Sequence, residues 1–429
     1  MLSKILQTFV FRFSSAIFSF VIVLITAHLL GTEGRGELSL LLVSITFILM
    51  LNNFIGGPSL VYLVPRYPSI QLLKISYAWG FIVCILGTIM LKTFSLIPDW
   101  LLFPVFLLSV LQSIVTIHHF FLLGKKEIKV VNIIAFTQPF MQILLILLIY
   151  WHQMLNVIQV IYAMYFSYTI TVLFSIYTMR NYFFVDVAFV DVALEVKKEK
   201  SLWKDMISYG FMNQVANIAQ LISYRANYYF LSAIVGIEAL GIFSTGTSVA
   251  ESVWLIGTSI SLVQYSDIAN TNDKMYAKVT TLSLLKLSCL ATIIALIVVN
   301  ILPSEFYVFI FGNQFSEIKV VLLWLSPGIL AISMGIVISH FFSGTGRYYI
   351  NAVSSGIGML FSIISAYYFI NHYQIMGASM VTSISYVIST ILLFYFFIKK
   401  EKVALKEFIP KISDVRMLIE QFRTKTTNN

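Results

Sequence analysis

The sequence predicts an all-α polytopic membrane protein with twelve transmembrane helices in two six-helix bundles, and three observations support this prediction. Of the 429 residues, 59% are hydrophobic and 11% are charged, whereas soluble domains carry roughly 25% charged residues. Apolar runs of about 18 or more residues, long enough to span a bilayer as a helix, recur along the chain. The third observation is an internal repeat at an offset of 205 residues.

Twelve apolar runs are candidates for spans. We expect the spans at residues 4–30, 37–63, 75–97, 100–123, 130–151, 156–179, 206–235, 241–265, 277–301, 318–343, 348–371 and 376–398. The first apolar stretch is too long for a cleavable signal, and no small-residue cleavage site follows it, so we interpret it as the first span. The two cysteines lie inside apolar runs and form neither a disulfide framework nor a metal motif.

The longest connector predicts the domain organisation. Residues 181–204 form a cytoplasmic linker between an N-terminal six-helix bundle (1–180) and a C-terminal six-helix bundle (205–398). A basic cytoplasmic tail follows at 399–429, and its residues 415–422 place apolar side chains on one helical face. This tail is either an amphipathic helix that lies on anionic lipid or a solvated segment.

Positive charges are distributed unevenly along the predicted topology. With the N-terminus inside, 22 of the 28 Lys and Arg residues lie in or beside inner segments, and three, Arg35, Lys92 and Lys319, lie outside. This asymmetry is a strong positive-inside signal. We therefore expect a multi-pass membrane protein with both termini in the cytoplasm. The net charge of +9 then reflects topology rather than nucleic-acid binding.

The internal repeat relates the two predicted bundles. "LLGTEGRGELS" (29–39) aligns without gaps on "IVGIEALGIFS" (234–244), so that Gly31 falls on Gly236. A second echo links "HFFLLGKKEIKVVN" (119–132) to "HFFSGTGRYYIN" (340–351). Two six-span halves have the same orientation, so a pseudo-two-fold axis along the membrane normal would relate them. Such an architecture is typical of transporters and places the substrate path between the halves.

Polar side chains follow one face of the first span and one face of the seventh. The offset of 205 carries the stripe of the first span, which includes Ser15 and Ser19, onto the stripe of the seventh. Polar stripes that face lipid are costly, so we expect both stripes to line a shared hydrated cavity. The alternative is hydrogen bonding between helices in a dry bundle. The predicted cavity-lining residues are Ser15, Ser19, Asn213, Asn217, Gln220, Tyr224 and Glu251.

Four ionisable residues lie deep in the spans: Arg12, Arg225, Glu251 and Lys286. Each lies about 12–15 Å from the nearer span end, at about 1.5 Å per residue, in a core of ~30 Å. A charge there costs at least about 2.5–3.5 kcal/mol and by default marks function. Arg225 either pairs with Glu251 or is free for a ligand. If the pair forms, Arg12 and Lys286 are the better candidates for an anionic ligand. We expect all three cations, Arg12, Arg225 and Lys286, to attract the anionic group into the cavity.

Three segments resemble a known family: "AHLLGTEGRGELSLL" (27–41), "GGPSLVYLVPRY" (56–67) and "ISYRANYYFL" (222–231). They are similar to the polysaccharide-exporter branch of the multidrug/oligosaccharidyl-lipid/polysaccharide (MOP) flippase superfamily, which includes Wzx-type flippases of O-antigen and capsule repeat units. The resemblance covers all twelve spans. It implies two six-helix bundles around a V-shaped cavity with alternating access, and basic cavity residues for a pyrophosphate. Asn227 stands where the family often has aspartate, so no ion-coupling role carries over to it.

The resemblance implies a flippase that moves an oligosaccharide on undecaprenyl pyrophosphate to the outer leaflet, for lipopolysaccharide O-antigen or other surface polysaccharide. A drug or cation antiporter on the same scaffold is the first alternative, although one deep acid stands against three bases. A membrane glycan polymerase or ligase is less favoured, because the longest outer connector, 302–317, contains no His and the chain no Asp-x-Asp. A pump is disfavoured, because no phosphate-binding loop motif occurs.

The expected partners follow from this function. They are the lipid-linked oligosaccharide, membrane lipids, a polysaccharide polymerase and a chain-length regulator, with no nucleic acid, and we expect a monomer. We expect no catalytic residues, no cofactor and no metal. The glycan stays open, and so does the choice between the membrane potential and a proton or sodium counter-flow as the driving force.

Overall fold

The computed structural model describes residues 2–152, 156–189, 199–269 and 273–409, and every regular element in these ranges is a helix. Nine helices within them are long and apolar enough to cross a membrane. The prediction of an all-α polytopic membrane protein is thereby confirmed. Within the same ranges α7 (Glu199–Ile234) is not among the nine, because Arg225 and several amide side chains lower its hydropathy.

Two of the nine apolar helices are unusually long and contain a break. Phe13–Leu63 and Tyr348–Glu401 comprise 51 and 54 residues, whereas about 20 residues cross the hydrocarbon core. The backbone leaves the helical region at Gly31, with φ 69°, and at Gln374, with φ 50°. Both breaks fall in the predicted connectors between the first and second spans and between the last two. The count of twelve crossings stays a prediction.

The described helices belong to two compact units. Unit 1 comprises Met1–Ile218 together with Ile310–Gln314, and unit 2 comprises Ala219–Phe309 together with Phe315–Asn429. The division therefore falls inside α7. Helix also covers both ends of the predicted linker 181–204, because α6 continues to Phe189 and α7 begins at Glu199. Both helices therefore extend beyond the apolar spans that the sequence predicted, 156–179 and 206–235.

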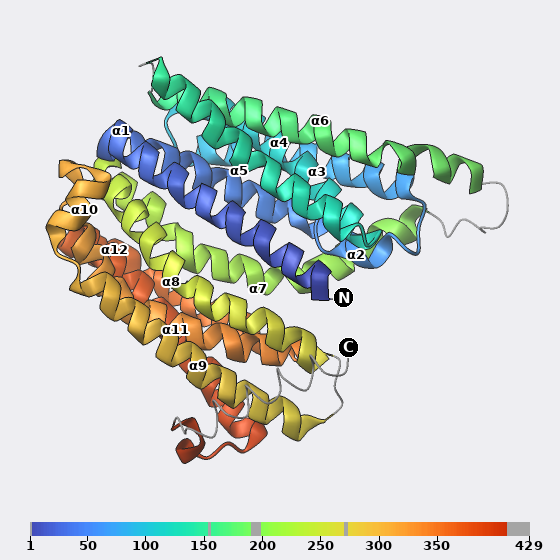
Figure 1. The fold of residues 1–429 in the computed structure, drawn as a ribbon. Coiled ribbons are helices and arrows are strands. Elements are labelled where there is room, and N and C mark those ends of the chain that lie inside the picture. Colours follow the sequence, from blue (N-terminus) through green and yellow to red (C-terminus); the bar gives the residue numbers. More distant parts are fainter. Residues whose placement is uncertain (1, 153–155, 190–198, 270–272, 410–429) are drawn as a thin grey trace. The chain divides into compact units, whose positions relative to one another are not determined.

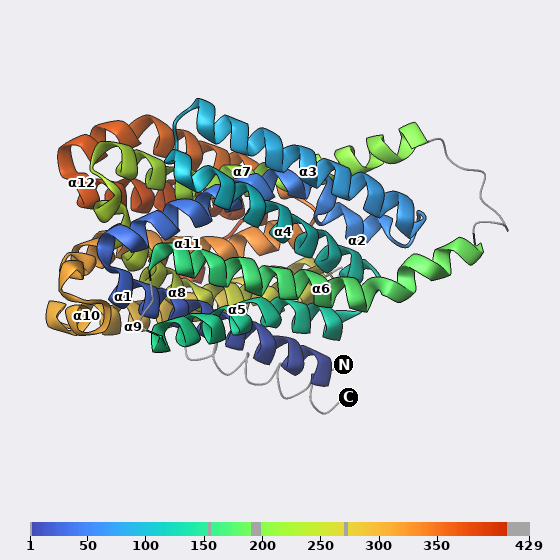
Figure 2. The same cartoon turned by 90° about the horizontal axis from the view of Figure 1, so that it is seen from above.

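Unit 1 is built from helices that pack around an apolar core. They are α1 (Leu2–Gly56), α2 (Ser59–Leu63), α3 (Ser69–Thr93), α4 (Asp99–Gly124), α5 (Ile128–Trp151), α6 (Val157–Phe189) and the first part of α7. Helix α1 packs against α3, α4 and α5, and α6 packs against α4 and α5 (Figures 1 and 2). Ile55, Leu72, Phe121, Ile134 and Met179 bring five of these helices together in the core.

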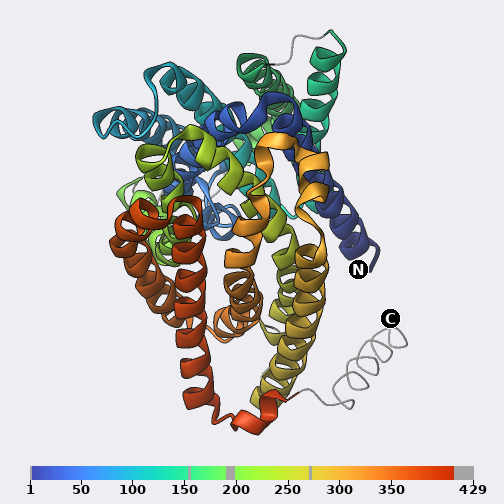
Figure 3. The same cartoon turned by 90° about the vertical axis from the view of Figure 1, so that its left-hand side faces the viewer.

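Unit 2 has an apolar core of its own. Its helices are the rest of α7, α8 (Ile237–Ala269), α9 (Lys274–Ile301), most of α10 (Ser304–Phe311), α11 (Ile318–Gly344), α12 (Tyr348–Glu401) and the short η2 (Leu405–Phe408). Helix α11 packs against α8, α9 and α12, and η2 contacts α9 after the chain turns at the end of α12 (Figure 3). Leu285, Val337, Ile350 and Phe397 lie in this core.

The first repeated motif corresponds to a shared backbone feature. Gly31 and its repeat partner Gly236 both have positive φ, 69° and 124°, a conformation that glycine adopts without steric cost. The surroundings differ. The amide and the hydroxyl of Thr32 both donate to Gln314 Oε1, at 3.0 and 3.3 Å, and this oxygen fills the space that a Cβ at Gly31 would need. At Gly236 no atom lies within 4 Å of such a Cβ.

The second repeated motif forms the same helix end twice. Lys126 follows α4 and Gly346 follows α11, with φ 64° and 74°. In both turns the amide of the next residue donates to a carbonyl five residues earlier, at 3.0 and 2.7 Å. This left-handed cap satisfies the last carbonyl groups of a helix. The repeat seen in the sequence is therefore a repeat of local backbone structure.

Candidate functional site

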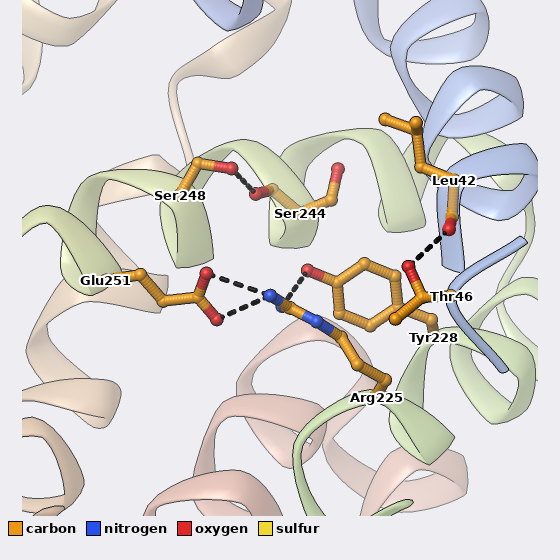
Figure 4. Close-up of polar contacts among 7 residues, drawn as sticks. All are labelled: Leu42, Thr46, Arg225, Tyr228, Ser244, Ser248 and Glu251. Atoms are coloured by element: carbon orange, nitrogen blue, oxygen red, sulfur yellow. Dashed lines mark hydrogen bonds and ion pairs between the residues drawn. The ribbon is translucent and has the colours of Figure 1, made fainter. Parts of the chain in front are cut away.

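An ion pair lies in unit 2 between α7 and α8. Arg225 Nη2 is 2.8 Å from Glu251 Oε1 and donates a hydrogen bond to Oε2 at 2.9 Å (Figure 4). The two side chains are 24% and 21% exposed. Of the two alternatives that the sequence left open for Arg225, the structure contains the paired one. The pair is mostly removed from solvent while part of each charged group remains accessible.

Tyr228 is the second side chain that holds the guanidinium of Arg225. It lies three residues after Arg225 on α7, and residues three apart on a helix lie on the same face. Arg225 Nη1 donates to the Tyr228 hydroxyl at 2.8 Å, and the guanidinium carbon is 5.2 Å from the ring centroid (Figure 4). The side chain of Arg225 is therefore fixed by one carboxylate and one phenol, in the planar geometry that guanidinium donors favour.

Three aromatic rings from three helices meet beside this pair. Tyr224 precedes Arg225 on α7, and its ring centroid lies 5.4 Å from that of Trp254 on α8 and 4.7 Å from that of Tyr386 on α12. The Gln220 side-chain amide donates to the Tyr224 hydroxyl. Tyr224 and Trp254 are partly exposed, whereas Tyr386 is buried. This set of residues presents aromatic faces, an amide and an ion pair in one region.

Helix α7 is also joined to α12 by small polar contacts. Asn227 Nδ2 donates to Thr382 Oγ1 at 2.8 Å, and the hydroxyls of Ser223 and Ser385 share a hydrogen bond. All four residues are buried. These contacts are of the kind that hold helices together in membranes. Helix α7 therefore carries both hydrogen bonds to a neighbouring helix, at Ser223 and Asn227, and residues predicted to line a cavity, such as Tyr224.

The predicted cavity-lining residues are divided between the units. Gln220, Tyr224 and Glu251 belong to unit 2, whereas Ser15, Ser19 and Asn217 belong to unit 1. Ser15 donates to the Phe11 carbonyl one turn earlier, at 2.9 Å, while Ser19 and Asn217 are exposed. The side chain of Asn213 lies outside the described part of the chain. A shared hydrated cavity therefore stays a prediction.

The other two predicted cations have different positions. Lys286 lies on α9 and is only 7% exposed. Arg12 lies on α1, and its side chain is outside the described part of the chain. Binding of an anion by Arg12 and Lys286 stays a prediction for both.

Three contributors to the site were missed in the sequence. Tyr228 and Trp254 lie three residues after Arg225 and Glu251, so helical spacing alone places them beside the two charges. The sequence therefore contains a local signal for both residues. Tyr386 lies 161 residues beyond Arg225, and no local pattern in the sequence connects the two.

Unit 1 contains a buried polar contact that the sequence analysis also missed. His118 on α4 is fully buried, and its Nε2 and Nδ1 lie 2.5 Å from the Tyr77 hydroxyl and 2.6 Å from the Ser175 hydroxyl. Both ring nitrogens therefore have partners, as buried polar groups require. Within the described ranges, no group of three or more His, Cys, Asp or Glu side chains is placed to hold a metal ion.

Comparison with known proteins gives a limited match in sequence. No protein-family model matches the chain. The capsular polysaccharide biosynthesis protein CapF of Staphylococcus aureus is 26% identical over 170 residues. The match spans 39% of this chain and only 43% of that relative.

Comparison with solved structures gives a match over nearly the whole chain. The lipid II flippase MurJ, in an inward closed conformation, has a TM-score of 0.72 at 15% identity, covering 98% of this chain and 93% of that chain. An inward-facing multidrug resistance MATE-family transporter of the MOP superfamily has a TM-score of 0.71 at 13% identity, covering 90% and 94%. The chain therefore has the fold of MOP-superfamily transporters.

Proposed function

We propose that this chain, which has the fold of MOP-superfamily transporters, is a Wzx-type flippase for a lipid-linked oligosaccharide. The substrate is a repeat unit on undecaprenyl pyrophosphate. The protein moves it from the cytoplasmic to the outer leaflet of the plasma membrane by alternating access, for O-antigen, capsule or other surface polysaccharide. Arg12, Arg225 and Lys286 attract the pyrophosphate, while the polyprenyl chain stays in the lipid.

The single observation that carries this proposal is the ion pair of Arg225 and Glu251. Arg225 lies nine residues before the end of α7, or about 14 Å along the helix axis. A charge at such a depth is expensive in a membrane unless it faces protein, water or a ligand. The guanidinium is fixed by Glu251 and Tyr228 yet remains partly exposed. Arginine in this arrangement presents the donor geometry that phosphate groups accept.

The charge count favours an anionic ligand. Of the four ionisable residues deep in the predicted spans, three are basic and one, Glu251, is acidic. Their net charge of about +2 matches the roughly two negative charges of a diphosphate in a low-dielectric surrounding, where charges are little screened. Moving one negative charge outward through an inside-negative membrane gains about 2.3 kcal/mol per 100 mV. Part of the driving force can therefore be electrical, and a proton or sodium counter-flow is the other candidate.

The two similar proteins support the choice of substrate. One is named for capsular polysaccharide biosynthesis, and the other, with the same fold, is a lipid II flippase. In this proposal the chain crosses the membrane twelve times, and the breaks at Gly31 and Gln374 are the outer turns of α1 and α12. The protein is a monomer with two six-helix bundles, and both termini lie in the cytoplasm. A polymerase and a chain-length regulator act on the exported repeat unit.

A multidrug or cation antiporter is the second candidate, because a MATE-family transporter shares the fold at a similar TM-score. An exporter of cations needs acidic groups for its substrate. Here Glu251 is already bound to Arg225. A membrane glycan polymerase or ligase is the third candidate, and the fold shared with a flippase and with a MATE-family transporter favours transport over it.

A gene deletion in the native host separates the first two candidates. We expect the deletion to abolish surface polysaccharide and to cause lipid-linked repeat units to accumulate, and the parent gene to restore export. We expect growth inhibition by ethidium and by tetraphenylphosphonium to be equal with and without the gene. Unchanged surface polysaccharide together with increased sensitivity to both cations would instead identify an antiporter.

A further inference from the structure

We propose that Tyr224, Trp254 and Tyr386 form a binding site for the sugar ring attached directly to the diphosphate. We call these three residues the ring cluster. This inference rests on the proposed function, because the diphosphate bound at Arg225 fixes which sugar reaches the ring cluster. The ring cluster would recognise the sugar, while Arg225 would bind the diphosphate.

The ring cluster is assembled from three helices of unit 2. Tyr224 lies 4.7 Å from Tyr386 and 5.4 Å from Trp254, and the Trp254 and Tyr386 centroids are 6.2 Å apart. Tyr224 and Tyr386 meet edge to face, at 75°. Tyr386 is 2% exposed and backs the other two rings, which are partly exposed. The packing fixes the orientation of the two outer rings, as a preformed binding surface requires.

The ring cluster adjoins the ion pair through the chain itself. Tyr224 directly precedes Arg225, and Trp254 lies one helical turn after Glu251 on the same face of α8. Tyr386 packs against both of these rings and so completes the surface beside the pair. In a lipid-linked oligosaccharide the first sugar is bonded to the diphosphate. A phosphate held at Arg225 would therefore place that sugar within reach of these rings.

The chemistry of the ring cluster suits a saccharide. One face of a pyranose consists of C–H groups, which pack on aromatic rings, while its hydroxyls need polar partners. The Tyr386 hydroxyl is buried and has no hydrogen-bond partner among the described residues. A buried polar group without a partner is unfavourable, and a ligand hydroxyl would supply one after a small movement. Gln220, which donates to the Tyr224 hydroxyl, offers an amide at the edge of the same surface.

The guanidinium disfavours the other common ligand of aromatic clusters. Lipophilic cations stack on tyrosine and tryptophan faces. Here Arg225 directly follows Tyr224 and is itself 5.2 Å from the neighbouring Tyr228 ring. Glu251, the acidic group at this place, already pairs with Arg225 and is less available to a second cation, whereas the partly exposed guanidinium can still donate to a phosphate. The arrangement therefore favours an anionic saccharide over a cationic drug.

Binding of two probes to the purified full chain in lipid nanodiscs tests the inference. The probes are farnesyl diphosphate and the same compound extended by one N-acetylglucosamine. We expect the parent to bind the sugar-bearing probe about two- to tenfold more tightly, the range that one aromatic contact contributes. Trp254→Leu should reduce this preference, measured as the ratio of the two affinities, to about one. Trp254→Phe should retain part of the preference, which separates ring loss from misfolding.

The matched control is Trp324→Leu, because Trp324 lies on α11 in the same unit and is 41% exposed. It should bind both probes as the parent does. Equal affinity of the parent for the two probes, or a full preference in Trp254→Leu, would overturn the ring cluster and leave the cationic site intact. If Arg225→Gln binds farnesyl diphosphate as the parent does while Trp254→Leu loses the sugar preference, the cationic site is wrong and the ring cluster stands. A parent that binds neither probe would overturn both.

Discussion

Arg225 on α7 places one guanidinium nitrogen 2.8 and 2.9 Å from the two carboxylate oxygens of Glu251 on α8. The pair joins two helices of unit 2 and also supplies the charged group of the candidate site. Its two roles, in stability and in transport, can be separated by experiment.

The contributions of Arg225 and Glu251 to the stability of the fold should be coupled. Removing one partner of a largely buried pair leaves an uncompensated charge. We therefore expect Glu251→Gln alone to destabilise the protein more than the double variant with Arg225→Gln does. Denaturant unfolding in detergent micelles should give a coupling free energy of about 1–3 kcal/mol in the double-mutant cycle. Additive effects of the two substitutions would contradict the prediction.

The matched control for that cycle is the pair of Lys278 and Glu407, which are 3.2 Å apart at the end of unit 2. The Glu407 side chain is 36% exposed and the Lys278 side chain 15%. Both residues lie near the predicted inner ends of spans, where water and salt screen charges more than in the hydrocarbon core. We therefore expect a smaller coupling for this pair than for Arg225 and Glu251. A coupling of equal size would mean that the intramembrane pair has no special role in stability.

Substitutions of Arg225 should affect export in a graded way. Arg225→Lys keeps the charge but loses the planar donor set that contacts Glu251 and Tyr228, so we expect partial export. Arg225→Gln removes the charge, and we expect a larger loss. Arg12→Gln and Lys286→Gln should each reduce surface polysaccharide as well. The measurement is surface polysaccharide in the deletion strain at matched protein level, with Lys319→Gln as the control for loss of a positive charge elsewhere.

The break in α1 should depend on glycine. Gly31 has φ 69°, where a side chain costs roughly 1–2 kcal/mol. Its Cβ would also collide with the Gln314 amide oxygen. We expect Gly31→Ala to lower the thermal unfolding midpoint, and the added change Gln314→Ala to recover part of the loss. Gly356→Ala is the control, because no atom within 4 Å would meet its Cβ and its helical backbone suits alanine. Equal midpoints for Gly31→Ala and the parent would exclude this account.

The topology can be tested at two exposed positions. Glu33 follows the break in α1, and Lys402 follows α12, with both side chains exposed. We expect Glu33→Cys, in a background without Cys84 and Cys289, to react with a membrane-impermeant maleimide on intact cells. Lys402→Cys should react only after permeabilisation, because the positive-inside pattern places it in the cytoplasm. Labelling of Lys402→Cys from outside would reverse the proposed orientation.

The sequence predicted the helices well because apolar length and turn residues are local signals. The repeat motif placed a turn at Gly31, and the backbone has positive φ there and at Gly236. The pairing of Arg225 with Glu251 was one of two stated alternatives, because adjacent spans with opposite charges limit the choice. The position of Tyr386 was not predictable, since it depends on how α12 packs against α7 and α8 over a large sequence separation.

Transport in a defined membrane tests the central claim most directly. The purified chain is reconstituted into liposomes together with the host's lipid-linked repeat unit, and a membrane-impermeant oxidant of sugar diols reports how much of the substrate has changed leaflet. We predict that the parent increases the leaflet exchange of this substrate and that Arg225→Gln abolishes most of the increase. If the Arg225→Gln variant moves the substrate as fast as the parent, or the parent moves none, the account is contradicted.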